Sequence, residues 1–206
     1  MGKGRIEAFS DAVLAIIITI MVLEFKSPHD AALGALRPLL PVFLSYLLSF
    51  IYLGIYWNNH HYLLYVTHRV SAAILWANLH LLFWLSLVPF ATRWMGENHF
   101  AAAPMALYGL ILLLAGTAYL FLQHAILAQE GADSLLAAAI GRDWKGKVSV
   151  LMYGVAIPVA FLRPWIAGTF YVVAALMWLV PDRRIERAVS LARPAPLAGT
   201  QGRAGG

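Results

Sequence analysis

Long runs of apolar residues alternate with short polar clusters along most of the chain. A transmembrane helix needs about 20 apolar residues, so a run near that length with few charges predicts a membrane span. Short segments that carry charge or proline separate six such runs. The last two runs are short, which predicts tilt or partial burial in protein. The six predicted spans cover about 6–25, 38–65, 70–92, 102–128, 148–162 and 165–180.

The composition agrees with this pattern. The chain is 61% hydrophobic and 12% charged, whereas soluble domains carry about 45–50% apolar and about 25% charged residues. We therefore expect an all-α membrane protein with six transmembrane helices, whose membrane domain occupies 1–181 and leaves no room for a soluble catalytic domain. The remaining 182–206 are rich in Arg, Pro, Ala and Gly and are predicted to form a basic, disordered tail. Cysteine is absent, which excludes disulfides and thiolate metal sites.

Positive charge is distributed unevenly between the predicted loops. Most of the 15 Lys and Arg residues lie at the amino end, after the second and fourth spans, and in the tail. Six spans put all of these segments on one side of the membrane, and the side richer in Lys and Arg is cytoplasmic. We expect a multi-pass protein of the plasma membrane with both termini in the cytoplasm. This charge bias sets orientation and requires no nucleic-acid partner.

The first span carries an aliphatic stripe. Ile16, Ile20 and Leu23 are offset by four and three residues, so they share one helix face, and Phe9 extends it. One interpretation is a stripe that faces lipid or packs against other helices. The other is a constriction, in which several copies of this helix meet on an axis and aliphatic rings gate a pore by dewetting. Thr19 lies beside the stripe and would then offer a hydroxyl to a cation; otherwise such a hydroxyl bonds to its own helix.

Polar residues of the first three spans lie at similar predicted depths. An ionisable residue within a span, here Asp11, marks a functional site. His61 and Asn78 reach the same cytoplasmic half, and Trp57 shares a helix face with His61. These residues form either a structural network that locks the first span in place, or a proton relay or cation site. His60 and His61 point about 100° apart on a helix, so we expect no metal site there.

Several motifs are absent from the sequence. It contains no Thr-Val-Gly-Tyr-Gly filter loop, no G-x-x-x-x-G-K-[ST] loop, and no H-E-x-x-H or G-x-S-x-G pattern. A carbonyl-lined filter and ATP-driven transport by this chain are therefore not expected. We predict no catalytic residues.

Two groups of residues carry a resemblance to a known family. Arg5-x-x-x-Phe9-Ser10-Asp11, followed by Ala15-Ile16-x-x-Thr19, resembles the first-helix signature of the bacterial relatives of the endolysosomal potassium channel, the transmembrane protein 175 family. The similarity continues in Trp57-x-x-x-His61 on the second span and in Asn78 and Pro89-Phe90 on the third. Spans four to six match only in number and placement.

The resemblance implies a potassium-selective leak channel. It implies a homotetramer in the lipid bilayer, with the first helix of each chain lining a central pore, and no cofactor beyond permeant potassium ions. The implied constrictions are Ile16, Ile20 and Leu23, and the implied selectivity residue is Thr19. One departure is Ile20, where the family often has Leu, a stiffer side chain of similar volume. The implied packing network consists of Arg5, Phe9, Ser10, Asp11, Trp57, His61 and Asn78.

Two other functions fit parts of the sequence. A proton-coupled transporter would use Asp11 and His61 and would show saturable, pH-driven uptake. A non-conducting membrane scaffold would use the aliphatic stripe for packing only. A channel, in contrast, would show passive flux that follows the potassium gradient.

Overall fold

The computed structural model describes residues 2–131 and 144–179, and within them it is helical with no strands. The prediction of an all-α membrane protein is confirmed. The predicted tail, 182–206, lies outside the described residues, as does position 180 at the end of the sixth predicted span. The helices are α1 (Lys3–Leu23), the 3₁₀ helix η1 (Leu33–Leu39), α2 (Leu40–Tyr65), α3 (Ala72–Ser86), α4 (Val88–Glu97), α5 (Ala102–Glu130), α7 (Trp144–Leu162) and α8 (Pro164–Leu179).

Five helical segments of the described chain are long and apolar enough to cross a membrane. They are Lys3–Leu23, Leu33–Tyr65, Ala72–Glu97, Ala102–Glu130 and Trp144–Leu162. The sixth predicted span corresponds to α8, which is apolar but has only 16 residues. A helix this short covers about 24 Å, less than the hydrocarbon core of about 30 Å, so α8 requires tilt of its neighbours or local thinning of the bilayer.

The third predicted span is interrupted in the structure. It divides at Leu87 into α3 and α4, and α4 then continues to Glu97, beyond the predicted end at about 92. Pro89 is the second residue of α4. It has no N–H to donate to the carbonyl of Leu85, and its ring would clash with that carbonyl in a continuous helix. The break at Leu87 avoids both problems.

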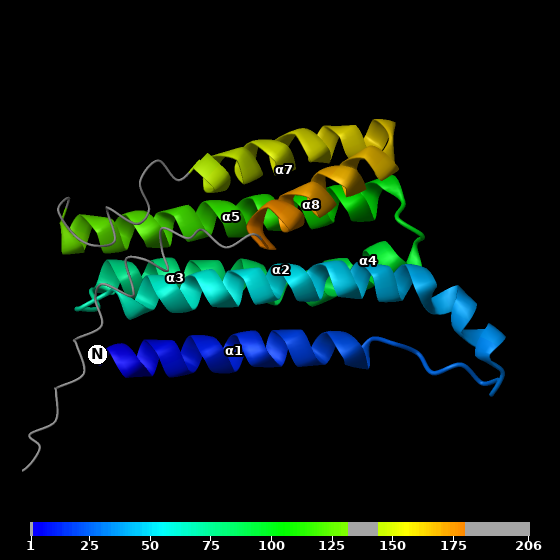
Figure 1. Ribbon diagram of the computed structural model, residues 1–206, viewed down its shortest axis with the longest axis horizontal. Helices are drawn as coiled ribbons and strands as arrows, with labels where there is room; N and C mark the ends of the chain where they lie inside the picture. The colour runs from blue at the N-terminus through cyan, green and yellow to red at the C-terminus, as the bar shows by residue number, and fades with distance from the viewer. Residues whose placement is uncertain (1, 132–143, 180–206) are drawn as a thin grey trace, which may run out of the picture.

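The helices stack in layers across the molecule (Figure 1). Helix α1 lies along one edge and packs against α2, α3 and α4. Helix α5 lies in the middle and contacts α3 and α4 on one side and α7 and α8 on the other. Helices α7 and α8 form an antiparallel pair at the opposite edge from α1. The first helix is therefore a peripheral element of its own subunit.

Four buried tyrosines fill the centre between α2, α5, α7 and α8. The Tyr52 hydroxyl donates to the carbonyl of Tyr171 at 2.6 Å, and the Tyr153 hydroxyl lies 3.3 Å from that of Tyr52. Tyr108 shares a hydrogen bond with Ser49 at 3.0 Å. Because each hydroxyl has a partner, these large rings are buried without leaving unpaired polar groups.

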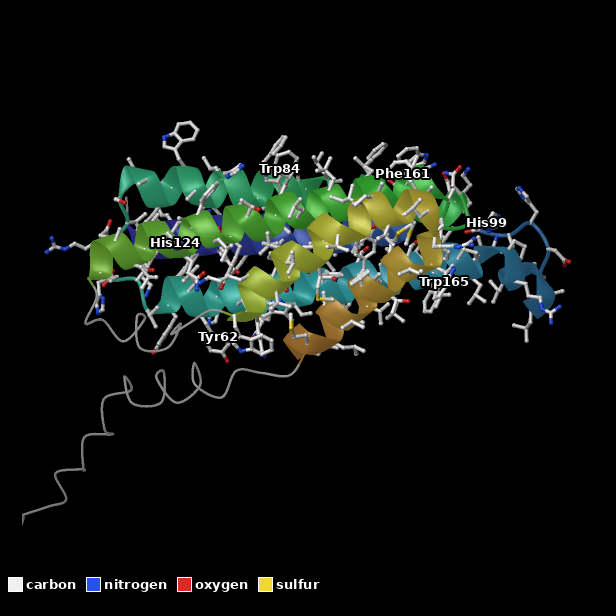
Figure 2. All side chains as sticks on the ribbon, turned by 90° about the horizontal axis from the view of Figure 1, so that it is seen from above. Tyr62, Trp84, His99, His124, Phe161 and Trp165 are labelled. Carbon is white, nitrogen blue, oxygen red and sulfur yellow. The ribbon has the colours of Figure 1, made fainter. Side chains whose placement is uncertain are left out.

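Aromatic and histidine side chains mark the two ends of the bundle. Figure 2 shows His99 and Trp165 toward one end and Tyr62 and His124 toward the other. Trp165 is exposed and lies at the start of α8. Amphipathic aromatic rings favour the level of the lipid headgroups, so these positions fit a helical bundle that crosses a bilayer lengthwise.

Candidate functional site

The two faces of α1 have different environments. Ile6, Ser10, Leu14, Ile17 and Met21 are buried, and their spacing of four, four, three and four residues keeps them on one face. They contact the neighbouring helices α2, α3 and α4 as a group. Helix α1 is thus anchored to its own subunit by one continuous apolar face that contains a single hydroxyl, Ser10.

The aliphatic stripe lies on the other side of α1. Ile16 is 58% exposed, Ile20 38%, Leu23 79%, and Phe9 at the inner end 49%. These side chains therefore do not pack within the described part of their own subunit, which removes one of the two bland interpretations of the stripe. Lipid, or α1 helices of other copies, are the surfaces that can cover them.

Thr19 is exposed on α1 and its hydroxyl bonds to its own helix. Its Oγ1 lies 2.9 Å from the carbonyl oxygen of Ala15 and 3.0 Å from that of Ile16. The hydroxyl has one proton and two acceptor lone pairs. Because the proton is donated to the helix, the oxygen keeps its lone pairs for a group outside the helix. This is the polarity that a cation requires, and the back-bond and the cation-facing role are therefore compatible.

A buried polar cluster joins α1, α2 and α3. Asn78 on α3 donates from Nδ2 to the Ser10 hydroxyl on α1 at 2.9 Å. Its Oδ1 lies 2.6 Å from Nε2 of His60 on α2. All three residues are at most 1% exposed. In an apolar environment these groups would be costly unless paired, so the cluster fixes the relative position of three helices.

A second contact holds the adjacent side of α1. The Trp57 indole on α2 donates from Nε1 to Oδ1 of Asp11 at 3.0 Å. The ring of His61, one turn further along α2, stacks on the Trp57 ring with centroids 6.2 Å apart. Asp11 and Trp57 are both exposed on the isolated subunit. The hydrogen bond therefore lies beside the outward face of α1 rather than in the subunit core.

The structure places His60 where the sequence suggested His61. His61 is exposed, and its described contacts are the rings of Trp57 and Tyr62. Adjacent residues on a helix point about 100° apart, so only one of the two histidines can face α3. The signal was present in α2, where Ser45, Ser49 and His60 recur on the buried face while Trp57 and His61 share the exposed one.

The remaining predicted network residues are at the edge of this arrangement. Arg5 is exposed, and its side chain makes no hydrogen bond or ion pair with the described residues. Lys3, which the sequence analysis left aside, makes a contact instead. Its Nζ donates to the carbonyl of Tyr65 at 2.5 Å and lies 5.3 Å from the centre of the Tyr65 ring. This ties the inner end of α1 to the end of α2.

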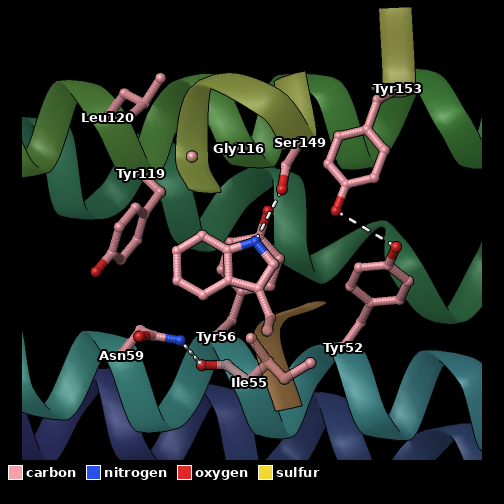
Figure 3. Close-up of a pocket in the computed structure, with 11 residues that line it drawn as sticks. Tyr52, Ile55, Tyr56, Asn59, Gly116, Tyr119, Leu120, Ser149 and Tyr153 are labelled. Carbon is pink, nitrogen blue, oxygen red and sulfur yellow. Dashed lines mark hydrogen bonds between the residues drawn. The ribbon is translucent and has the colours of Figure 1, made fainter. Parts of the chain in front are cut away.

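A small pocket lies away from α1, between α2, α5, α7 and α8 (Figure 3). Tyr52, Tyr56, Tyr119, Tyr153 and Asn59 contribute to its walls. Its cavity volume is about 40 Å³, which accommodates about three water molecules. Across residues 2–131 and 144–179, no three His, Asp or Glu side chains gather in a way that could hold a metal ion.

These features define a class of protein: an all-helical, multi-pass membrane protein whose first helix is anchored by buried polar side chains and presents an aliphatic face outward. The sequence profile of the family described as "Endosomal/lysosomal potassium channel TMEM175" matches residues 5–89, which run from α1 to the start of α4. A protein named as a potassium channel from Chryseobacterium sp. (strain P1-3) is 53% identical over 189 residues, covering 92% of this chain and 98% of that protein. The chain therefore belongs to the TMEM175 family.

Two further similarities agree with this assignment. A protein named as a potassium channel from Chamaesiphon minutus is 33% identical over 187 residues, 83% of this chain and 91% of that protein. The fold is also similar to the crystal structure of a lysosomal potassium-selective channel TMEM175 homolog from Chamaesiphon minutus. The TM-score is 0.75 at 29% identity, and the match covers 87% of this chain and 97% of that one.

Proposed function

We propose that this protein is a potassium-selective channel that conducts passively through a central pore. The pore lies on the axis of a homotetramer and is lined by four copies of α1. The observation that carries the proposal is the outward aliphatic stripe of Ile16, Ile20 and Leu23 on a helix whose opposite face is fully anchored. The names of the relatives, which are potassium channels, supply the ion.

The chemistry of the stripe fits a hydrophobic gate. Rings of Ile16, Ile20 and Leu23 around an axis would exclude water when they are close and admit hydrated ions when they separate. Thr19 lies between these rings along the helix and directs oxygen lone pairs outward. A ring of four such hydroxyls would replace part of the hydration shell of a potassium ion, without a carbonyl filter.

The geometry around Asp11 favours a channel over proton-coupled transport. A relay between Asp11 and His61 requires a hydrogen-bonded path, but Asp11 accepts from the Trp57 indole and His61 stacks on the face of that ring. The indole N–H is a donor only and does not exchange protons at ordinary pH. We therefore assign Asp11, Ser10, Asn78 and Trp57 to anchoring α1, together with His60.

The location follows from the charge bias. We place the protein in the plasma membrane with both termini in the cytoplasm, because the segments on that side hold most of the Lys and Arg residues. Reporter fusions at the carboxyl end test this orientation. A reporter that is active only outside the cytoplasm would contradict it.

The proposed function is tested by potassium flux into liposomes that contain the purified protein. Wild-type protein should carry a flux that follows the potassium gradient and does not saturate. Ile16→Asn should raise the flux and reduce discrimination against sodium, because an amide ring wets a constriction that isoleucine keeps dry. The matched control is Leu151→Asn, which changes an exposed aliphatic residue on α7 and should leave the flux unchanged. Wild-type conductance in Ile16→Asn would argue against a constriction at that position.

A further inference from the structure

The outer end of α1 is joined to α4 by a network of four charged side chains. Glu24, the residue that follows α1, accepts a hydrogen bond from Nη1 of Arg93 on α4. Nε of Arg93 donates to Oε1 of Glu97 at 3.2 Å, and Nζ of Lys26 lies 3.6 Å from the same oxygen. Two acids and two bases balance one another. Arg93 is the central member, since its fork reaches both carboxylates.

Arg93 is held on a rigid support. Gly96, three residues further along α4, lies so close to α2 that an added Cβ would be 2.6 Å from the Ser45 Oγ and 2.7 Å from the Val42 Cα. Thr92, on the other side of Arg93, places its hydroxyl 2.7 Å from that of Ser49 on α2. Helix α4 is therefore fixed against α2, and Arg93 cannot follow α1 if α1 moves.

The network acts on the residue next to the outermost constriction. Glu24 directly follows Leu23, the most exposed member of the aliphatic stripe. Phe25, on the other side of Glu24, packs edge-on against Tyr46 of α2 with ring centroids 5.3 Å apart. The buried face of α1 ends at Met21. Beyond that point, the ion pair and this ring contact are what hold the end of the helix.

We propose that Arg93 and Glu24 form a latch that positions Leu23 in the pore, an inference that rests on the proposed channel function. Both are positioning residues, because they act on ions only through Leu23. With the latch closed, the outer end of α1 stays against α4 and the Leu23 ring keeps its width. With the latch broken, the last turn of α1 is free to tilt, and the ring widens and wets.

An alternative role for Glu24 predicts the opposite result. Carboxylates near a pore entrance attract cations and raise flux, so removal of Glu24 would then lower the flux. The latch predicts instead that Glu24→Ala raises potassium flux in liposomes by about fivefold, the scale set by loss of one partly exposed ion pair. The sign of the change separates the two roles. A lower flux in Glu24→Ala would overturn the latch.

The matched control is Glu97→Ala. It removes the same charge and the other carboxylate partner of Arg93, but Glu97 lies on α4 rather than on the pore helix. Its flux should stay within about twofold of wild type, because Glu24 and Arg93 remain paired. An increase equal to that of Glu24→Ala would mean that surface charge, and not the hold on α1, sets the flux, and the latch would be rejected.

A charge-conserving variant and a charge swap complete the test. Glu24→Asp keeps the charge and shortens the side chain by one methylene, so it should also raise the flux; a wild-type flux would contradict the latch even if Glu24→Ala fails to assemble. The double change Glu24→Arg with Arg93→Glu should return the flux toward wild type from the elevated level of Arg93→Glu alone. Absence of flux in the wild-type protein would reject the channel function itself, which is a separate outcome.

Discussion

The side chain of Asn78 donates a 2.9 Å hydrogen bond to the hydroxyl of Ser10, and this contact joins α3 to the buried face of the first helix. Asn78 also meets His60 of α2 through its other amide atom. One amide thus satisfies polar groups from two other helices. This makes Asn78 the residue whose loss should most disturb the position of α1 without touching its outward face.

Asn78→Leu should lower the thermal stability of the protein. It keeps the approximate volume but leaves the Ser10 hydroxyl and the His60 ring without their shared partner, at a cost of about 1–2 kcal/mol. For a chain of this size the unfolding midpoint should fall by about 2–6 °C. The measurement is intrinsic tryptophan fluorescence of the detergent-solubilised protein during heating.

The control for that variant is Asn58→Leu, an exposed amide on α2. Its unfolding midpoint should remain close to that of the wild type. Equal midpoints for all three proteins would mean that the buried cluster contributes no net stability.

Trp57→Phe should weaken the anchor of α1 at Asp11. Phenylalanine keeps an aromatic ring but lacks the N–H that donates to the Asp11 carboxylate at 3.0 Å. Hydrogen bonds to charged groups contribute about 1.5–3 kcal/mol, and partial exposure places this one at the lower end. Thermal unfolding measures the loss. Asp11→Asn should cost less, because the amide oxygen still accepts the bond.

The Asp11→Asn variant also separates channel from transporter. A channel in which Asp11 only anchors the helix should keep its passive potassium flux after this substitution. A proton-coupled transporter would lose pH-driven uptake, because the amide cannot carry a proton. Flux at a fixed potassium gradient, with and without a pH gradient, is the measurement.

Thr19→Val should reduce selectivity without reducing stability. The threonine hydroxyl bonds only to carbonyls of its own helix, and valine has nearly the same shape, so packing is retained. The potassium-to-sodium permeability ratio should fall because the ring of oxygen atoms is lost. Thr19→Ser should keep the ratio, since it keeps the hydroxyl.

Thr169→Val is the matched control for Thr19. The Thr169 hydroxyl also bonds to its own helix, at 3.0 Å from the Trp165 carbonyl, and is exposed on α8. Its permeability ratio should equal that of the wild type. If Thr19→Val discriminates against sodium as well as the wild type does, Thr19 is not the selectivity residue.

Gly96→Ala should destabilise the junction of α4 and α2. The added methyl would lie 2.6 Å from the Ser45 Oγ and 2.7 Å from the Val42 Cα, and a backbone atom cannot rotate away. Overpacking of this kind costs about 1–3 kcal/mol. Gly154→Ala on α7, where a Cβ meets no atom within 4 Å, should be neutral or slightly stabilising. Thermal unfolding of both variants in the same detergent tests the contrast.

The sequence predicted the features that depend on length and period. Apolar runs of about 20 residues gave the helices, and the offsets of four and three in Ile16, Ile20 and Leu23 gave a common face on α1. Which way that face points could not be read from its composition, because a lipid-facing stripe and a packing stripe are both aliphatic. The structure answers this for the subunit, since Ser10 and its neighbours occupy the packed side.

Features that depend on the meeting of distant helices were less accessible. Asp11, Trp57 and Asn78 were identified from depth and residue type, but the choice between His60 and His61 depends on the rotation of α2, which the apolar pattern around both histidines leaves undetermined. The pair of Glu24 and Arg93 connects positions 69 residues apart. Each residue alone reads as an ordinary charge at a membrane surface, so no local pattern predicts their contact.

The layered packing separates two kinds of work within one subunit. The helices that hold α1 are α2, α3 and α4, and the family profile likewise ends at Pro89, at the start of α4. Helices α7 and α8 rest on α5 at the far edge, where short α8 meets the bilayer. Relatives can therefore adapt their outer helices to membranes of different thickness or lipid content while the ion path keeps its dimensions.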